Sequence, residues 1–244
     1  MGWFRPGAAV LALVATLAVA CTDPTAPDAQ GSDPTPGASP LALSYTGAVL
    51  HKGDYCHFLQ QAIPGNNTLP VEHGCLFHME HPADLFATDG QNYSVSEVVG
   101  DVQLAVRGPA DSKVMIACRM QPRIEFWFWI SADGHWNIAS VPDVHNPEDL
   151  VSAQDEESMR QYVKVGSLQN HMQFKCAGGS RSRNVTLAIN MNGHQFAALS
   201  IPMPAPEVSL ARPATPWFVD VGARLTSAGA LDGTAAALQL YQNE

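Results

Sequence analysis

The side chains best placed to do chemistry lie in one aromatic run, Phe126-Trp127-Phe128-Trp129. In an extended strand successive side chains point to opposite faces, so both tryptophans share a face with Glu125 and both phenylalanines share the other. If the phenylalanines line a core, the two indoles lie about 7 Å apart and form a platform of the kind that stacks on sugar rings. This arrangement predicts a ligand-binding site at Trp127, Trp129 and Glu125. In the alternative, a loop such as residues 141–166 folds over the indoles as a second small core.

Histidines are the second group of possible functional residues, and five of the nine lie between residues 51 and 81. Imidazole and carboxylate groups are ligands of zinc and copper. The spacing fits no metal signature, because Gly74 and Pro82 prevent the helix on which neighbouring histidines would share a face. The sequence therefore predicts surface histidines and no bound metal, with His73, His78 and His81 as weak candidates. The whole group comprises His51, His57, His73, His78 and His81, with Glu72 and Glu80 between them.

The start of the chain predicts export. Arg5 is followed by an uncharged apolar run, with small residues at Val19 and Ala20 before Cys21. A basic start, a short apolar segment and a small-residue cleavage site are typical of a signal peptide, which we expect at residues 1–20. The segment Leu17-Ala18-Val19-Ala20-Cys21 resembles a bacterial lipobox, which implies acyl chains such as palmitate on Cys21. The resulting anchor places the protein at the extracytoplasmic face of the cell membrane. An ordinary cleaved signal peptide with an accidental cysteine is the alternative.

A proline-rich segment follows the cysteine. Residues 21–40 contain few apolar side chains, so they are expected to be a disordered tether, and residues 41–244 to be one folded domain. The chain has a formal net charge of −10, which argues against binding to nucleic acid. Such a charge favours neutral or cationic partners, although it also serves solubility.

Four cysteines remain after Cys21. An even number in an exported domain favours disulfides, and four cysteines allow three pairings. We favour Cys56 with Cys75 and Cys118 with Cys176. Unpaired or metal-bound thiols are the alternative.

Short runs of β-branched and aromatic residues predict an all-β fold from residue 98 onward. Asp133-Gly134 and Asn192-Gly193 lie between such runs and predict hairpin turns. One weak helix is expected to start at Pro147, with Leu150, Val151 and Met159 on its apolar side. The predicted strands are Val98–Val106, Val114–Cys118, Ile124–Ile130, Trp136–Ala139, His171–Lys175, Val185–Asn190, Gln195–Ile201, Trp217–Leu225 and Ala236–Tyr241.

Several segments in order resemble a family of concanavalin A-like, laminin G-like domains that are common on lipoproteins of high-GC Gram-positive bacteria. The resemblance covers residues 101–241, and residues 41–97 match it poorly. It implies a two-sheet jelly roll and agrees with pairing of Cys118 with Cys176. The matching segments are Phe126-x-Phe128-x-Ile130-Ser131-x-Asp133-Gly134-x-Trp136-x-Ile138, Asn170-x-Met172-x-Phe174-x-Cys176-x-Gly178, Leu187-x-Ile189-x-Met191-Asn192-Gly193 and Val219-x-Val221-Gly222.

The resemblance also raises the question of a calcium site, because such sandwiches sometimes hold calcium at a rim through turn oxygens. Turn aspartates also serve backbone geometry, which is the alternative, and no other cofactor is expected. The candidate ligands are Asp133, Asp143, Asn146 and Asp149.

Signatures of a hydrolase are missing from the sequence. A retaining glycosidase needs two carboxyl groups about 5 Å apart, and no E-x-D-x-x-E run supplies them. No G-x-S-x-G motif marks a serine nucleophile. We therefore expect a non-catalytic binding module, for glycans or cell-envelope components. A glycan hydrolase of the same superfamily and an envelope structural protein with a protein partner are the alternatives.

Overall fold

The computed structural model describes residues 49–51, 56–58, 63–71, 73–88, 93, 95–120, 124–141, 147–178, 184–202 and 217–242. The predicted signal peptide, Cys21 and the tether up to residue 40 lie outside the described residues. Within the described ranges, no helix combines the length and the hydropathy needed to cross a membrane.

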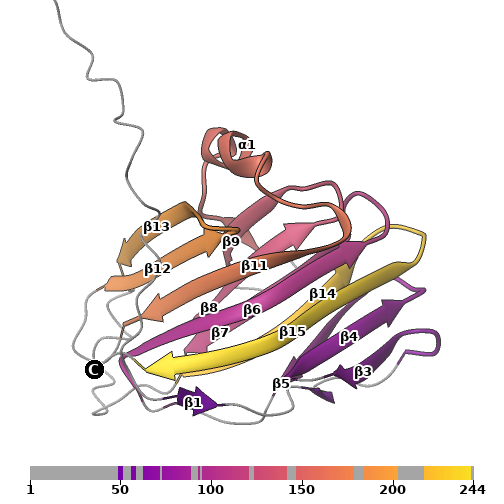
Figure 1. Ribbon diagram of the computed structural model, residues 1–244, viewed down its shortest axis with the longest axis horizontal. Helices are drawn as coiled ribbons and strands as arrows, with labels where there is room; N and C mark the ends of the chain where they lie inside the picture. The colour runs from indigo at the N-terminus through magenta and orange to yellow at the C-terminus, as the bar shows by residue number, and fades with distance from the viewer. Residues whose placement is uncertain are drawn as a thin grey trace, which may run out of the picture. The chain divides into compact units, whose positions relative to one another are not determined.

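The domain is a sandwich of two antiparallel sheets, as the sequence predicts (Figure 1). In the eight-stranded sheet β1 (Val49–His51) pairs with β15, beside the main order of strands. That order is β13 (His194–Pro202), β12 (Asn184–Met191), β11 (Gly166–Ala177), β6 (Glu97–Arg107), β15 (Leu231–Gln242), β4 (Gly74–Met79) and β3 (Asn67–Val71). The seven-stranded sheet has the order β10 (Glu148–Asp149), β9 (Trp136–Ser140), β8 (Ile124–Ser131), β7 (Lys113–Met120), β14 (Trp217–Leu225), β5 (Ala83–Thr88) and β2 (His57–Phe58).

Residues 41–97, which match the laminin G-like pattern poorly, supply strands to both sheets. β3 and β4 extend the eight-stranded sheet beyond β15, while β5 and β2 extend the seven-stranded sheet beyond β14. β4 alternates regularly, with Cys75, Phe77 and Met79 buried and the residues between them exposed. This period of two gives the strand one core face and one solvent face. Residues 67–88 are therefore part of the sandwich rather than a separate flap.

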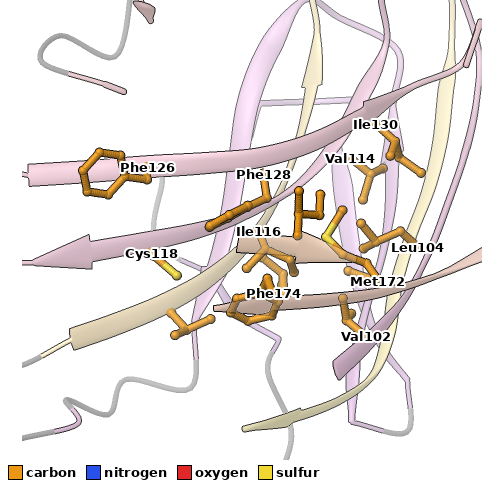
Figure 2. Close-up of a cluster of buried hydrophobic side chains, with 14 of the residues drawn as sticks. Val102, Leu104, Val114, Ile116, Cys118, Phe126, Phe128, Ile130, Met172 and Phe174 are labelled. Atoms are coloured by element: carbon orange, nitrogen blue, oxygen red, sulfur yellow. The ribbon is translucent and has the colours of Figure 1, made fainter. Parts of the chain in front are cut away.

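The core lies between the sheets and is filled from both sides. Phe128 of β8 meets Phe174 of β11, with ring centroids 5.7 Å apart (Figure 2). Gly100 of β6 makes room for the second ring, because a Cβ at this position would lie 2.1 Å from Phe174. The predicted disulfide between Cys118 of β7 and Cys176 of β11 is present and joins the two sheets. The sheets are thus held together by buried apolar area and by a covalent link.

The hairpin between β12 and β13 turns at Asn192 and Gly193, as predicted. Both have positive φ, 52° and 84°, which suits a tight two-residue hairpin turn. The Asn192 amide also donates to the buried Asn170 side chain at 2.9 Å. Asn170 in turn bonds both the N–H and the C=O of Lys164. The two asparagines therefore fix the turn and the segment that enters β11.

The predicted helix begins later than expected. Glu148 and Asp149 pair with β9 as the short strand β10, and α1 (Ala153–Arg160) follows. Ser152 is the N-cap residue, because its hydroxyl accepts a hydrogen bond from the N–H of Asp155 at 3.2 Å. The acidic residues after Pro147 were therefore wrongly predicted to start the helix, since a better cap lies downstream.

Candidate functional site

The predicted tryptophan platform lies on the expected face but is buried. Trp127 and Trp129 point away from the inter-sheet core, on the outer face of the seven-stranded sheet. Only 1% and 7% of their surfaces are exposed. They form a second small apolar cluster together with Phe86, Met115, Ala117 and Val141. The platform hypothesis is therefore wrong. The indoles are covered, as in the alternative, but among the described residues only Val141 comes from the segment 141–166 that was expected to fold over them.

Two cations and one aromatic ring cover the indoles. The Arg224 guanidinium lies 4.6 Å from the ring centroid of Trp127, and the Lys113 ammonium lies 3.6 Å from that of Trp129. Phe86 packs beside Trp127 with centroids 5.5 Å apart. Such contacts stabilise cations and remove the ring faces from solvent. A sugar ring therefore finds no open indole face here.

Glu125 also has a structural contact. Its carboxylate accepts a hydrogen bond from the indole N–H of Trp127 at 2.5 Å. On other strands of the same sheet, Asp220 pairs with Arg119 at 3.1 Å, and Asp84 binds Arg224 through two nitrogens at 2.5 and 2.6 Å. The three carboxylates thus lie on β8, β14 and β5 and each has a hydrogen-bonding partner.

The three candidate metal ligands are not brought together. His73 precedes β4 and His78 lies near its far end, which separates their Cα atoms by roughly 17 Å. His78 instead donates a hydrogen bond from Nδ1 to the Asp232 carboxylate at 2.7 Å, and its Nε2 atom lies 3.6 Å from the Glu80 carboxylate. His81 is exposed. Among the described residues no group of three or more His, Cys, Asp or Glu is arranged to hold a metal ion.

The other candidate ligands are only partly described. The side chains of His51 and His57, together with Glu72, Asp143 and Asn146, lie outside the described residues. Asp133 accepts a hydrogen bond from the Ser131 hydroxyl at 2.5 Å, and Asp149 is exposed in β10. The structure therefore does not test whether these oxygens hold calcium.

The remaining cysteines lie side by side as thiols. Cys75 is fully buried on β4, and Cys56 directly precedes β2 of the opposite sheet. A hydrogen bond with Cys56, followed by burial, raises the pKa of the Cys75 thiol well above its ordinary range. The structure shows no disulfide bond between them, so their pairing stays a prediction.

A different surface is hollowed, on the outer face of the eight-stranded sheet. β11 and β15 flank β6, and the pairing of each with β6 is irregular, between Gly166 and Asn170 in β11 and between Ala236 and Gln239 in β15. Bulges of this kind redirect side chains and are frequent beside functional sites. One hollow of about 460 Å³ lies there, lined by Val71, His73, Gln103, Gln169, Ala236, Ala237 and Gln239.

Two of these lining residues have unusual backbones. His73 and Ala237 have φ of 51° and 54°, although neither is glycine. A backbone hydrogen bond links the two positions. The N–H of Leu238, the residue after Ala237, donates to the C=O of His73 at 2.8 Å. L-residues seldom adopt this conformation, and such strain concentrates at binding sites. The hollow is therefore bordered by two strained positions, one in β15 and one in the turn between β3 and β4.

A second hollow of about 460 Å³ continues the first. Its lining includes Ala105 of β6, Thr234 of β15 and Ser167 of β11, each two residues from a member of the first hollow. Residues two apart share a face of a strand, so both hollows lie on one face, and we call them together the trough. Its far end is lined by Leu69, Leu76, His78, Arg107 and Asp232.

The end of the trough that the first hollow forms carries uncharged hydrogen-bonding groups. Within the described part of the chain, the amides of Gln103 and Gln169 make no hydrogen bond, while Gln239 accepts one from the Tyr241 hydroxyl. An amide can both donate and accept, as a sugar hydroxyl can. Sequence reasoning missed these residues because they come from three strands far apart in the chain. The only local signal was a glutamine at an outward position of a predicted strand.

The comparisons with known proteins show the fold alone. No protein-family model and no curated protein matches the chain. Among solved structures, one associated with endo-acting O-glycanases that members of the human gut microbiota express to initiate mucin breakdown has a TM-score of 0.51 at 8% identity, covering 82% of this chain and 92% of that one. The potassium-bound carbohydrate recognition domain of Emp46p reaches 0.45 at 7% identity, covering 78% and 97%. The carbohydrate-binding module CBM66 from Bacillus subtilis reaches 0.43 at 8% identity, covering 73% and 89%. The chain is thus a two-sheet concanavalin A-like sandwich.

Proposed function

We propose that the protein is a membrane-anchored extracytoplasmic lipoprotein whose sandwich is a non-catalytic binding module for uncharged glycan segments. The trough is the proposed binding site. The observation that carries the proposal is a pair of amides, Gln103 and Gln169, that form no hydrogen bond with the described residues. They lie in a hollow bordered by the strained residues His73 and Ala237.

The shape and charge of the trough support this ligand class. A shallow hollow that follows the strands suits an extended chain of sugars better than a compact small molecule. Amide groups satisfy sugar hydroxyls without attracting counterions. The residues that line the first hollow include no Asp, Glu, Lys or Arg. The exposed Leu69 and Leu76, cross-strand neighbours at the far end, offer apolar contact for the C–H faces of a sugar.

A glycan array with the full-length protein in mild detergent tests the binding site. Replacing both amides (Gln103→Ala with Gln169→Ala) removes two hydrogen-bonding groups, which is expected to weaken binding roughly 10- to 30-fold at about 1 kcal/mol each. Gln195→Ala is the matched control, because Gln195 is exposed on β13, away from the trough. Failure to bind any neutral glycan, or equal binding by the double variant, contradicts the proposal.

The membrane anchor is tested separately. Cys21→Ala removes the thiol that would carry the acyl chains, so the protein is expected in the medium rather than in the membrane fraction. Retention of the variant in the membrane contradicts the lipid anchor and leaves the glycan test unaffected.

A further inference from the structure

Lys113 places a half-buried positive charge on the outer face of the seven-stranded sheet. It is half-buried at the start of β7, with its ammonium 3.6 Å above the Trp129 ring. Within the described part of the chain it forms no ion pair with any carboxylate. A cation partly removed from water is costly unless it has an opposite charge, and a ring face compensates for it only in part.

The surroundings of Lys113 increase this cost. Burial lowers the pKa of Lys113, and the neighbouring charge of Arg224 lowers it further. Asp149, Glu156 and Asp111 act in the opposite direction from β10, α1 and the turn before β7, but none of them pairs with the ammonium. The protein thus holds this lysine where its positive charge is not neutralised.

Arg224 is the direct cross-strand partner of Lys113. Like charges placed opposite each other on paired strands destabilise a sheet. Arg224 is itself matched by Asp84, which binds it through two nitrogens, so Asp84 does not neutralise Lys113 as well. Lys113, Arg224 and Asp84 lie side by side across three paired strands. Together they carry two positive charges and one negative charge, so one positive charge is left over.

A second observation on the same face also points to a binding site. Asn137 of β9 is the cross-strand partner of Trp129 and is only 2% exposed. Its Oδ1 atom is buried and accepts no hydrogen bond from the residues that the structure describes. Buried amide oxygens are nearly always hydrogen-bonded, so a donor such as a ligand hydroxyl would satisfy it. An unmatched cation and an unmatched acceptor thus lie on either side of Trp129.

We propose that this face is a second binding site, for the anionic group of an acidic glycan, with Lys113 as the residue that pairs with the anion and Asn137 as an acceptor for a neighbouring hydroxyl. The site is independent of the trough, which lies on the other sheet. Carboxylate and phosphate share the required chemistry, because each presents anionic oxygens to the ammonium.

Calorimetric titration of the full-length protein in mild detergent tests this site with short oligogalacturonate, with glycerol-phosphate oligomers and with a neutral galactose oligomer. Binding of one of the two anionic probes, at least tenfold weaker in Lys113→Met and unchanged in Lys113→Arg, is expected. The identity of the bound probe distinguishes carboxylate from phosphate as the source. Methionine keeps the apolar cover over Trp129 without the charge, so the fold is retained.

Lys164→Met is the matched control, because Lys164 is exposed between α1 and β11. The absence of binding to both anionic probes, or equal binding by Lys113→Met and wild type, overturns the inference. The Gln103→Ala/Gln169→Ala variant is expected to bind the anionic probe normally. Failure of the neutral-glycan proposal is thereby distinguishable from failure of this one.

Discussion

Arg224 lies directly over Trp127, with its guanidinium carbon 4.6 Å from the ring centroid. The guanidinium is held in place by two hydrogen bonds to Asp84, a residue 140 positions earlier in the chain. This contact closes the indole face that the sequence offered as a platform. It makes Trp127 a structural residue, 1% exposed, on the outer side of the sheet.

Trp127→Ala is therefore expected to lower stability and to leave glycan binding in the trough unchanged. Truncation of a buried tryptophan costs about 3–5 kcal/mol, because it removes contacts and leaves a cavity. Urea unfolding measures the loss, and Trp127→Phe, which keeps part of the ring, is the milder control. Wild-type stability together with lost neutral-glycan binding would restore the platform hypothesis.

The disulfide between β7 and β11 is expected to contribute strongly to stability. Its cysteines are 58 residues apart, and the chain-entropy model gives about 4 kcal/mol for a loop of this length. Replacing Cys118 and Cys176 together by alanine should lower the free energy of unfolding by this order in urea titration. A change below about 1 kcal/mol would show that the buried core holds the sheets together without the covalent link.

The thiols of Cys56 and Cys75 are expected to form a second disulfide after export. The two thiols lose two protons and two electrons to an oxidant, such as a disulfide oxidoreductase of the exporting compartment. Quantification of thiols in the unfolded, unreduced protein should then detect none of the four domain cysteines. Cys56→Ala should expose one reactive thiol, that of Cys75. Detection of both thiols in the exported wild-type protein would contradict the pairing.

The hydrogen-bonded pair of His78 and Asp232 predicts that the stability of the protein depends on pH. The hydrogen bond with Asp232 raises the pKa of His78 above 6.5, with a smaller contribution from Glu80. Because the folded pKa exceeds the unfolded one, the stabilisation is fully present below about pH 6.5 and is lost as pH rises through the folded value. An NMR titration of the imidazole should show the raised pKa, and Asp232→Asn should return it toward its ordinary value. An unchanged pKa in the variant would show that the pair is not formed in solution.

The second half of the fold could be predicted from the sequence because its strands alternate regularly. Phe126, Phe128 and Ile130 all face the core, and both predicted hairpin turns contain a glycine with positive φ. The strands before residue 89 were missed because their signals are weak. β3 contains Pro70, which an edge strand tolerates, and in β4 the outward Leu76 breaks the alternation of polar and apolar residues.

The candidate binding surfaces were harder to predict, since they depend on pairing between distant strands. Period two placed Trp127 on the correct face, but only the register of β14 with β5 and β7 brings Arg224 over it. The trough depends on two bulges, and a bulge leaves no consistent mark in the sequence. The strained backbone of Ala237 could not be inferred, because alanine is not a residue that favours positive φ.

The central claim is that neutral glycans bind in the trough on the eight-stranded sheet. Amide chemical-shift mapping of the isotope-labelled protein during titration with a neutral oligosaccharide from the array tests it most directly. The largest shifts are predicted at Gln103, Gln169, Ala237 and the side-chain amide of Gln239. Shifts confined to the seven-stranded sheet around Trp127, or no shifts at saturating oligosaccharide, would contradict the claim.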